Sequence, residues 1–153
     1  MKDILIIRQP FNNKEYKEMY DLRWKILRKP WDQPKGSEKD EMDSKSDGVY
    51  PFIALINDQI VGTARFHREN EHEGKIRYLA VKEKYRGQGI GKNLLDHLEW
   101  YAISLGIGYI KLNARKNAQG LFEKLQYHEI AEGPTLFKEI EHSVMGKQIL
   151  DLT

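Results

Sequence analysis

The run YRGQGIGKNLL, residues 85–95, places three glycines at alternate positions between Arg86 and Lys92. Glycine is a poor helix former, so three of them directly before an apolar helical run need a reason. Their N–H groups can approach a ligand with no Cβ in the way, and the start of a helix adds partial positive charge. Together with the charges of Arg86 and Lys92, the pattern indicates a cradle for a pyrophosphate. A turn that only reverses the chain is the structural alternative.

Two common phosphate-binding motifs do not fit this run. The dinucleotide pattern G-x-G-x-x-G fails because Lys92 stands where the third glycine belongs. The pattern G-x-x-x-x-G-K-[ST] fails because Arg86 replaces its first glycine and Asn93 replaces the hydroxyl residue. The remaining signal is a glycine-rich loop between a strand and a helix.

The elements that must position this loop are expected from periodicity and turn residues. Before it we expect a strand at 4–8, a helix from 14 that Pro30 ends, strands at 50–56 and 59–67 joined by a tight turn at Asn57-Asp58, and a strand at 75–81. After it we expect a helix at 90–105, a strand at 109–114, a short helix at 118–125 that Asn117 caps, and two strands from 127 to 142 separated by Gly133-Pro134. This order predicts a mixed, mostly antiparallel α/β sheet with helices on both faces, in one domain spanning 1–153.

Residues 30–48 form a long charged loop in this prediction. A loop of this length is either mobile or functional, and we weigh both readings. As a lid, it would use Trp31 and an acidic run to favour a cationic substrate. The acidic run consists of Glu38, Asp40, Glu41 and Asp43.

Composition excludes several classes of function. The 25 Lys and Arg against 23 Asp and Glu leave a net charge of +2, too balanced to indicate nucleic-acid binding. The absence of cysteine excludes disulfides, thiolate nucleophiles and zinc-thiolate sites. No histidine shows metal-ligand spacing, so no metal is assigned. The N-terminal apolar run is too short for a signal segment and no run reaches membrane length, so we expect a cytoplasmic protein with no membrane partner.

The segment IRYLAVKEKYRGQGIGKNLLDHLEWYA closely resembles the core motif of the GNAT superfamily of acyl-CoA-dependent N-acyltransferases. The family pattern [QR]-x-x-G-x-[GA] matches Arg86, Gly89 and Gly91. A second segment, LNARKNAQGLFEKLQYHEI, is similar to the strand, helix and strand that close around the cofactor in that family. Both resemblances lie in register over about residues 76–131. They imply a GNAT-like fold with splayed central strands, and transfer of an acetyl group from acetyl-CoA to a primary amine.

The resemblance also implies roles for individual residues. Acetyl-CoA would be bound by the strand before the loop, by the loop, and by three positions further along. The implied cofactor-binding residues are Leu79, Ala80, Val81, Arg86, Gly87, Gln88, Gly89, Ile90, Gly91, Lys92, Asn113, Asn117 and Phe122. Arg115 stands where the family often has an asparagine, so the resemblance leaves open which of the flanking Asn113 and Asn117 reaches the cofactor arm. The Leu79 N–H would also polarise the thioester carbonyl.

The sequence differs from the family at the positions of the proton donor and the general base. Phe122 occupies the frequent tyrosine position of the family, and phenylalanine cannot protonate a leaving thiolate. The usual carboxylate on the strand before the loop is replaced by Arg77 and Tyr78. His142 is the possible base, because it titrates in the right range. The other candidates are Glu141, His67 and Glu69.

Two classes of function remain open at this point. One is an amine acetyltransferase, and the other is a non-catalytic acyl-CoA-binding regulatory module that lost its acid at Phe122. The sequence does not name the amine acceptor or fix the oligomeric state, and a homodimer is possible.

Overall fold

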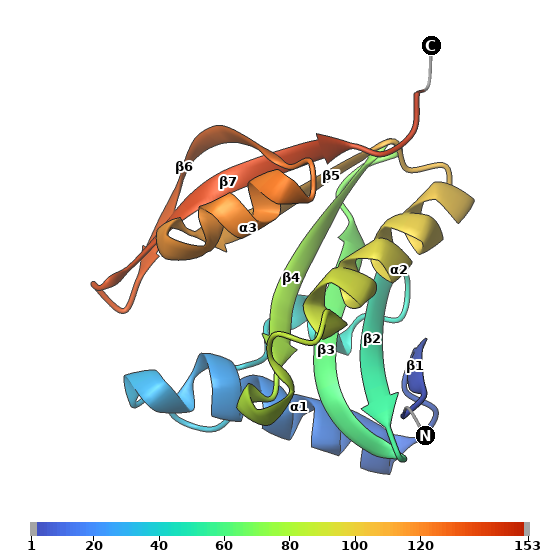
Figure 1. Cartoon of the computed structure of the whole chain (residues 1–153), viewed down its shortest axis with the longest axis vertical. Coiled ribbons are helices and arrows are strands. Elements are labelled where there is room, and N and C mark those ends of the chain that lie inside the picture. The colour runs from blue at the N-terminus through green and yellow to red at the C-terminus, as the bar shows by residue number, and fades with distance from the viewer. Residues whose placement is uncertain (1–2, 152–153) are drawn as a thin grey trace. The chain divides into compact units, whose positions relative to one another are not determined.

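The computed structural model describes residues 3–151. Seven strands form one sheet in the order β1-β2-β3-β4-β5-β7-β6 (Figure 1). Strands β4 and β5 pair in parallel, whereas the pairs β1–β2, β2–β3, β5–β7 and β6–β7 are antiparallel. The expected mixed, mostly antiparallel α/β class is confirmed.

The chain order of the elements agrees closely with the order expected from periodicity. The strands are β1 Leu5–Arg8, β2 Val49–Ile56, β3 Gln59–Arg68, β4 Glu73–Val81, β5 Tyr109–Arg115, β6 His128–Leu136 and β7 Ile140–Gln148. The α-helices are α1 Asn13–Leu27, α2 Ile90–Ser104 and α3 Gln119–Lys124. Short 3-10 helices are η1 Lys29–Trp31, η2 Glu41–Ser44, η3 Glu83–Tyr85 and η4 Lys116–Ala118.

The chain divides into two compact units, which are described separately. The first contains Met1–His67 and Tyr78–Leu98, and the second contains Arg68–Arg77 and Glu99–Thr153. Strand β4 and helix α2 each contribute residues to both units. The first unit holds the glycine loop, and the second holds the strands and short helix that follow it.

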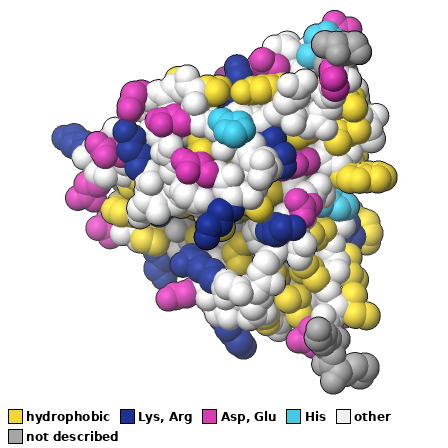
Figure 2. All heavy atoms as spheres, turned by 45° about the horizontal axis from the view of Figure 1, so that its top comes forward, with side chains coloured by type: hydrophobic (Ala, Val, Ile, Leu, Met, Phe, Trp, Pro, Cys, Tyr) yellow, Lys and Arg dark blue, Asp and Glu magenta, His cyan; other side chains and the backbone are white. Residues whose placement is uncertain are grey.

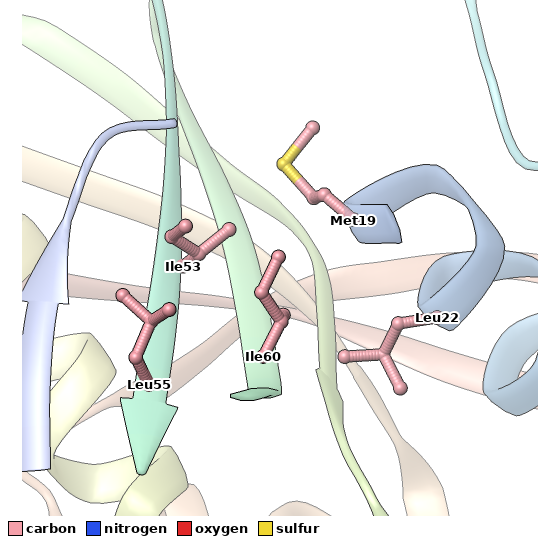
Figure 3. Packing of buried hydrophobic residues seen from close by; sticks show 5 residues of the cluster. All are labelled: Met19, Leu22, Ile53, Leu55 and Ile60. Carbon is pink, nitrogen blue, oxygen red and sulfur yellow. The ribbon is translucent and has the colours of Figure 1, made fainter. Parts of the chain in front are cut away.

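One face of the β2–β3 hairpin is covered by α1. Apolar residues of α1 recur on one side of the helix and pack on side chains from both strands (Figure 3). The buried cluster consists of Met19, Leu22, Ile53, Leu55 and Ile60. Asn12 is the N-cap of this helix, and its side chain accepts a hydrogen bond from the Glu15 N–H.

The first half of α2 covers the other face of the same hairpin. A Cβ added to Gly62 would lie 3.1 Å from a Leu94 methyl and 3.2 Å from an Ile90 methyl, so glycine allows this close approach. The Phe52 ring also lies 5.1 Å from the His97 ring of α2, in an edge-on contact. Since adjacent residues of β2 point to opposite faces, the prediction of helices on both faces is confirmed for this unit.

The predicted turn at Gly133-Pro134 is wrong. Both residues lie within β6, and the chain reverses at Phe137 and Lys138, whose φ angles are +53° and +62°. Gly133 serves close packing instead, because a Cβ there would lie 2.9 Å from the His142 backbone of β7. The final strand also continues to Gln148, beyond the expected end at 142.

The predicted N-cap at Asn117 is also wrong. Asn117 lies inside η4, and Ala118 occupies the N-cap position of α3 without a side-chain hydrogen bond. The chain tightens into a 3-10 turn before α3 starts, which moves the helix start beyond the polar residue.

Charged side chains of both signs are interspersed on the surface that Figure 2 shows. This distribution agrees with the net charge of +2. No helix among residues 3–151 is long and apolar enough to cross a membrane.

Candidate active site

The glycine loop follows β4 through η3 and ends at the start of α2. The Arg86 N–H bonds the Glu83 carbonyl at 3.2 Å, and Arg86 Nε donates to the Val81 carbonyl at 3.3 Å. Gly87 and Gly89 have φ angles of +78° and +81°, in the left-handed region that favours glycine. No atom lies within 4 Å of a Cβ added at either position, so the loop leaves open space along its backbone.

The loop presents positive charge and free N–H groups at one helix end. The first N–H groups of an α-helix have no partner inside the helix, and they carry its partial positive charge. In α2 the Asn93 N–H donates to the Gly89 carbonyl at 2.9 Å. The N–H groups without a partner inside the helix are therefore those of the residues between Gly89 and Asn93. Lys92 Nζ pairs with Asp96 at 2.9 Å on the exposed helix surface, so Asp96 partly neutralises its charge.

Gly91 differs from the other two loop glycines. Its φ is not in the left-handed region, and a Cβ there would make an ordinary 3.9 Å contact with Val81. Gly87 and Gly89 are thus required by the backbone conformation itself, with or without a ligand. Gly91 is the position where a side chain tests binding without straining the loop.

Strand β4 changes conformation one residue before the predicted carbonyl-binding segment. Tyr78 has a φ of +59°, which is rare for a bulky residue and occurs where surrounding structure enforces it. Ala80 is buried, whereas Leu79 and Val81 are half-buried. In the second unit, β4 pairs with β5 from Glu73↔Tyr109 to Ile76↔Leu112, so the left-handed residue follows the end of this paired stretch.

The second unit contains the remaining residues that were predicted to bind the cofactor. The Asn113 Oδ1 on β5 is buried and has no hydrogen-bond partner among the described residues. Such an orphaned acceptor suits an amide N–H of a ligand. Asn117 is exposed on η4, and Phe122 is half-buried on α3.

The Phe122 ring packs edge-on against Tyr127, with centroids 6.2 Å apart. Tyr127 is fully buried, and its hydroxyl donates to Glu99 Oε2 at 2.8 Å. Lys147 Nζ donates to the other oxygen of Glu99 at 2.8 Å. The Tyr127 phenol is therefore engaged inside a buried polar triad, and it does not replace the proton donor missing at Phe122.

His142 is the third residue of β7 and is buried, with its Nδ1 3.0 Å from the Pro134 carbonyl oxygen. A carbonyl only accepts, so Nδ1 carries the proton and Nε2 of the neutral ring carries the lone pair. The backbone of His142 pairs with Arg115 of β5. This geometry leaves Nε2 able to accept a proton. Of the other base candidates, Glu141 and Glu69 are exposed, and His67 is buried in the first unit, with Nδ1 3.5 Å from Arg65 Nη2.

The segment between α1 and β2 is folded onto the first unit by ion pairs. We call residues 32–48 the strap. Asp40 accepts from Arg65 Nη1 at 2.6 Å and Nη2 at 2.9 Å, and also from the Tyr78 hydroxyl at 3.1 Å. Asp43 pairs with Arg23 at 3.0 Å and with Arg65 at 3.1 Å. These five residues are the Arg23–Arg65 cluster.

Electrostatics of the cluster favour its ionised form. Burial alone would lower the pKa of Arg65, but hydrogen bonds and charges of Asp40 and Asp43 together raise it. Burial and the charge of Asp43 raise the pKa of the adjacent Tyr20 phenol. The acidic run of the strap is thus largely neutralised: Glu38 is buried and accepts from the Gly36 N–H, and only Glu41 of the four predicted acids is exposed.

Sequence reasoning missed Arg23 and Arg65 as site residues. Arg23 lies on the apolar stripe of α1, and a charged residue at a position expected in the core predicts a buried partner of opposite charge. Arg65 lies within β3 among buried residues, and it carries the same signal. Among residues 3–151 no group of three or more His, Cys, Asp or Glu is arranged to hold a metal ion.

Comparison with known proteins identifies the family. Residues 16–127 match the family model described as the acetyltransferase (GNAT) family. A Bacillus subtilis (strain 168) protein that is named as an acetyltransferase is 31% identical over 129 residues, covering 84% of this chain and 86% of its own.

Solved structures agree in fold. An aminoglycoside 6'-N-acetyltransferase complexed with coenzyme A has a TM-score of 0.81 at 18% identity, over 97% of this chain and 99% of its own. The ribosomal-protein-S18-alanine N-acetyltransferase of Escherichia coli has a TM-score of 0.79 at 20% identity, over 98% of this chain and 97% of its own. The protein therefore belongs to the GNAT family of acetyltransferases and is an acyl-CoA-dependent N-acyltransferase.

Proposed function

We propose that this protein transfers an acetyl group from acetyl-CoA to a primary amine by direct attack in a ternary complex. The observation that carries the proposal is the glycine loop. Gly87 and Gly89 take left-handed φ angles with open space beside them, at the start of α2. Backbone donors, helix charge and the Arg86 guanidinium together suit the pyrophosphate of coenzyme A.

The residues that would hold acetyl-CoA fit that group in two independent ways. Gly87 and Gly89 have no side chain to obstruct an anion, and Asn113 Oδ1 is a buried acceptor without a partner in the described chain. Arg86–Lys92 would bind the pyrophosphate, Leu79–Val81 and Asn113 would bind the pantetheine amides, and Asn117 and Phe122 would border the arm. Bound acetyl-CoA supplies an activated thioester carbonyl.

The chain's own groups would then orient and assist the attack. The Leu79 N–H donates to the carbonyl oxygen and stabilises the charge that develops there. Holding the amine beside the carbonyl contributes most of the acceleration, because proximity supplies up to about 7–11 kcal/mol. His142 Nε2 accepts the proton of the amine, while its Nδ1–H bond to Pro134 holds the ring. Phe122 offers no proton, so the thiolate leaves without help from this side chain.

The binding-only alternative loses its support. Its argument was the missing phenol at Phe122, but general acid help is worth only ~10²–10⁴-fold, and a thiolate is a fair leaving group. We further propose one acyltransferase domain over 1–153, a cytoplasmic location where acyl-CoA thioesters are used, and a homodimer as the assembly to test by light scattering.

Coenzyme binding and turnover are tested in two steps. At about a hundred times its dissociation constant, coenzyme A should stabilise the fold by roughly 2.7 kcal/mol, seen as a higher melting temperature. Release of the thiol from acetyl-CoA is then followed across a panel of amines. No thermal shift at millimolar coenzyme A would overturn the binding proposal, and binding without release for any amine would overturn the enzymatic one.

A further inference from the structure

The Arg23 guanidinium is buried with one of its edges unpartnered. The side chain has 0% exposed surface, and Nη1 donates to Asp43 at 3.0 Å. Nε and Nη2 have no hydrogen-bond partner within the described part of the chain. These two nitrogens carry parallel N–H bonds on the same edge, which is the fork that takes both oxygens of one carboxylate. This edge therefore has the donor geometry for a carboxylate, although protein atoms cover it in the closed fold.

The neighbours of Arg23 stabilise its charge but do not fill that edge. Its Cζ lies 4.5 Å from the centroid of the Tyr78 ring and 5.1 Å from that of Tyr20. Aromatic rings attract a cation, but they lack the oxygen lone pairs that charged N–H donors bind best. Buried donors without hydrogen bonds cost free energy. A ligand that supplies two oxygens would form the two hydrogen bonds that Arg23 Nε and Nη2 lack.

Building on the proposed function, we infer that the acceptor amine carries a carboxylate, as an amino acid does, and that this carboxylate binds the Nε–Nη2 edge of Arg23. Tyr78 contacts Arg23 and directly precedes Leu79 on β4, the residue proposed to polarise the carbonyl. Binding at Arg23 thereby brings an acceptor to the strand where the thioester is held. Because Arg23 has no exposed surface, the inference requires the strap, which supplies the Asp43 partner, to open when the ligand binds.

The unpartnered donors of Arg23 favour a single carboxylate over a cation. The positive charges of Arg23 and Arg65 equal the negative charges of Asp40 and Asp43, so the net charge of the cluster is zero. Asp40 and Asp43 are each engaged by at least three donors, including backbone N–H groups, so they offer a cation little. The Nε–Nη2 edge of Arg23 takes one planar monoanion, whereas a phosphate dianion would bring two negative charges to a cluster whose own charges cancel. The expectation that the acidic run of the strap favours a cationic amine stays a separate prediction.

The test uses the full-length protein saturated with coenzyme A, so that binding is read without turnover. Thermal unfolding and calorimetry compare each of the common L-amino acids with the amine formed by its decarboxylation, and phosphoethanolamine with ethanolamine. We expect at least one amino acid to bind ten times or more tightly than its decarboxylated partner. We expect phosphoethanolamine to show no such advantage over ethanolamine.

The variant Arg23→Lys keeps the charge and removes the two-nitrogen edge. It should lower the affinity for the amino acid about tenfold or more while coenzyme A affinity holds. Arg8→Lys is the control, because Arg8 lies outside the cluster and its guanidinium is already bonded to both oxygens of Glu15. If Arg23→Lys does not fold, the comparison of each amino acid with its decarboxylated amine in the native chain still tests whether a carboxylate is recognised.

The inference would be overturned by equal binding of amines and amino acids, by binding of phosphoethanolamine but of no amino acid, or by an Arg23→Lys variant with unchanged amino-acid affinity. The absence of binding by every amino acid would overturn it as well. The proposed function fails by a different measurement, since a missing thermal shift with coenzyme A alone is read before any acceptor is added.

Discussion

Arg65 donates to both carboxylate oxygens of Asp40, from Nη1 at 2.6 Å and from Nη2 at 2.9 Å. Arg65 is fully buried on β3, and Asp40 lies in the strap, 25 residues earlier in the chain. A pair shielded from water in this way holds its partners more firmly than an exposed pair, which competes with solvent. The strap is therefore an integral part of the first unit.

Asp43→Asn should destabilise the fold by about 3 kcal/mol, because it removes the shared anion between two fully buried guanidinium groups. Urea unfolding measures the change in the free energy of unfolding. Glu41→Gln is the control, since Glu41 lies in the same strap but is exposed, and should stay within about 0.5 kcal/mol of the native chain. A loss below about 1 kcal/mol for Asp43→Asn would show that the ion pairs do not hold the strap.

Gly91→Asp should abolish coenzyme A binding while leaving the fold intact. An acidic residue in the first turn of α2 is favourable to the helix, but its charge would face the pyrophosphate. Gly91→Ala should raise stability by up to about 1 kcal/mol, since alanine is the better helix former and its Cβ meets only Val81 at 3.9 Å. Calorimetric titration with coenzyme A compares the two. Equal affinity in both variants would make this loop a turn without a ligand.

His142→Asn should lower kcat about tenfold or more without unfolding the protein. An asparagine amide can keep the hydrogen bond to the Pro134 carbonyl, whereas the basic Nε2 is lost. The acidic limb of the pH–rate profile should flatten in the variant. Thiol release measured from pH 5 to 9 checks both effects. An unaltered rate and profile would remove His142 from the mechanism and leave a water-mediated base.

Phe122→Tyr should raise kcat or leave it unchanged, with little change in coenzyme A affinity. The ring already packs on Tyr127, so the substitution adds one hydroxyl to an existing contact. That hydroxyl would restore a proton donor for the leaving thiolate. Steady-state kinetics with a saturating acceptor measure the effect. A marked fall in kcat would mean that the acyl-CoA arm fills the space beside Phe122 in another way.

Glu15 should make folding stability depend on pH in the acid range. A hydrogen bond from Arg8, helped by the Phe11 N–H, lowers the pKa of Glu15 from 4.5 to about 2. A depressed carboxyl pKa contributes stability that is complete above the unfolded value near 4.5 and is lost as pH falls toward about 2. The native chain and Glu15→Gln should thus differ in free energy of unfolding at pH 6 and converge near pH 2. A constant difference across this range would contradict the assignment.

The sequence by itself determined the features that depend on neighbouring residues. The turn at Asn57 and Asp58 was correct because these residue types tolerate the φ angles of +51° and +63° that a tight hairpin requires. The order of strand, glycine loop and helix was correct for a similar reason, since Gly87 and Gly89 supply left-handed angles that other residues rarely adopt. Local chemistry is enough where backbone conformation is the constraint.

Local signals failed where packing overrode them. Gly133-Pro134 has the composition of a turn, but both residues lie within β6, at an irregularity in its pairing with β7, and a Cβ at Gly133 would lie 2.9 Å from the His142 backbone. The real turn uses Phe137 and Lys138, neither of which favours a positive φ. The pairing of β6 with β7 fixes the position of that turn, and pairing is a long-range property that composition does not carry.

Only the tertiary structure decided the role of the charged residues. The sequence placed Arg23 on the apolar face of a helix and the acids of the strap in a solvated loop, and gave no reason to join them. Folding brings Arg23 to Asp43 across 20 residues and Tyr78 to Asp40 across 38. A charge is stable in a core only when its partner arrives from elsewhere in the chain, so the identity of that partner becomes visible only in the folded protein.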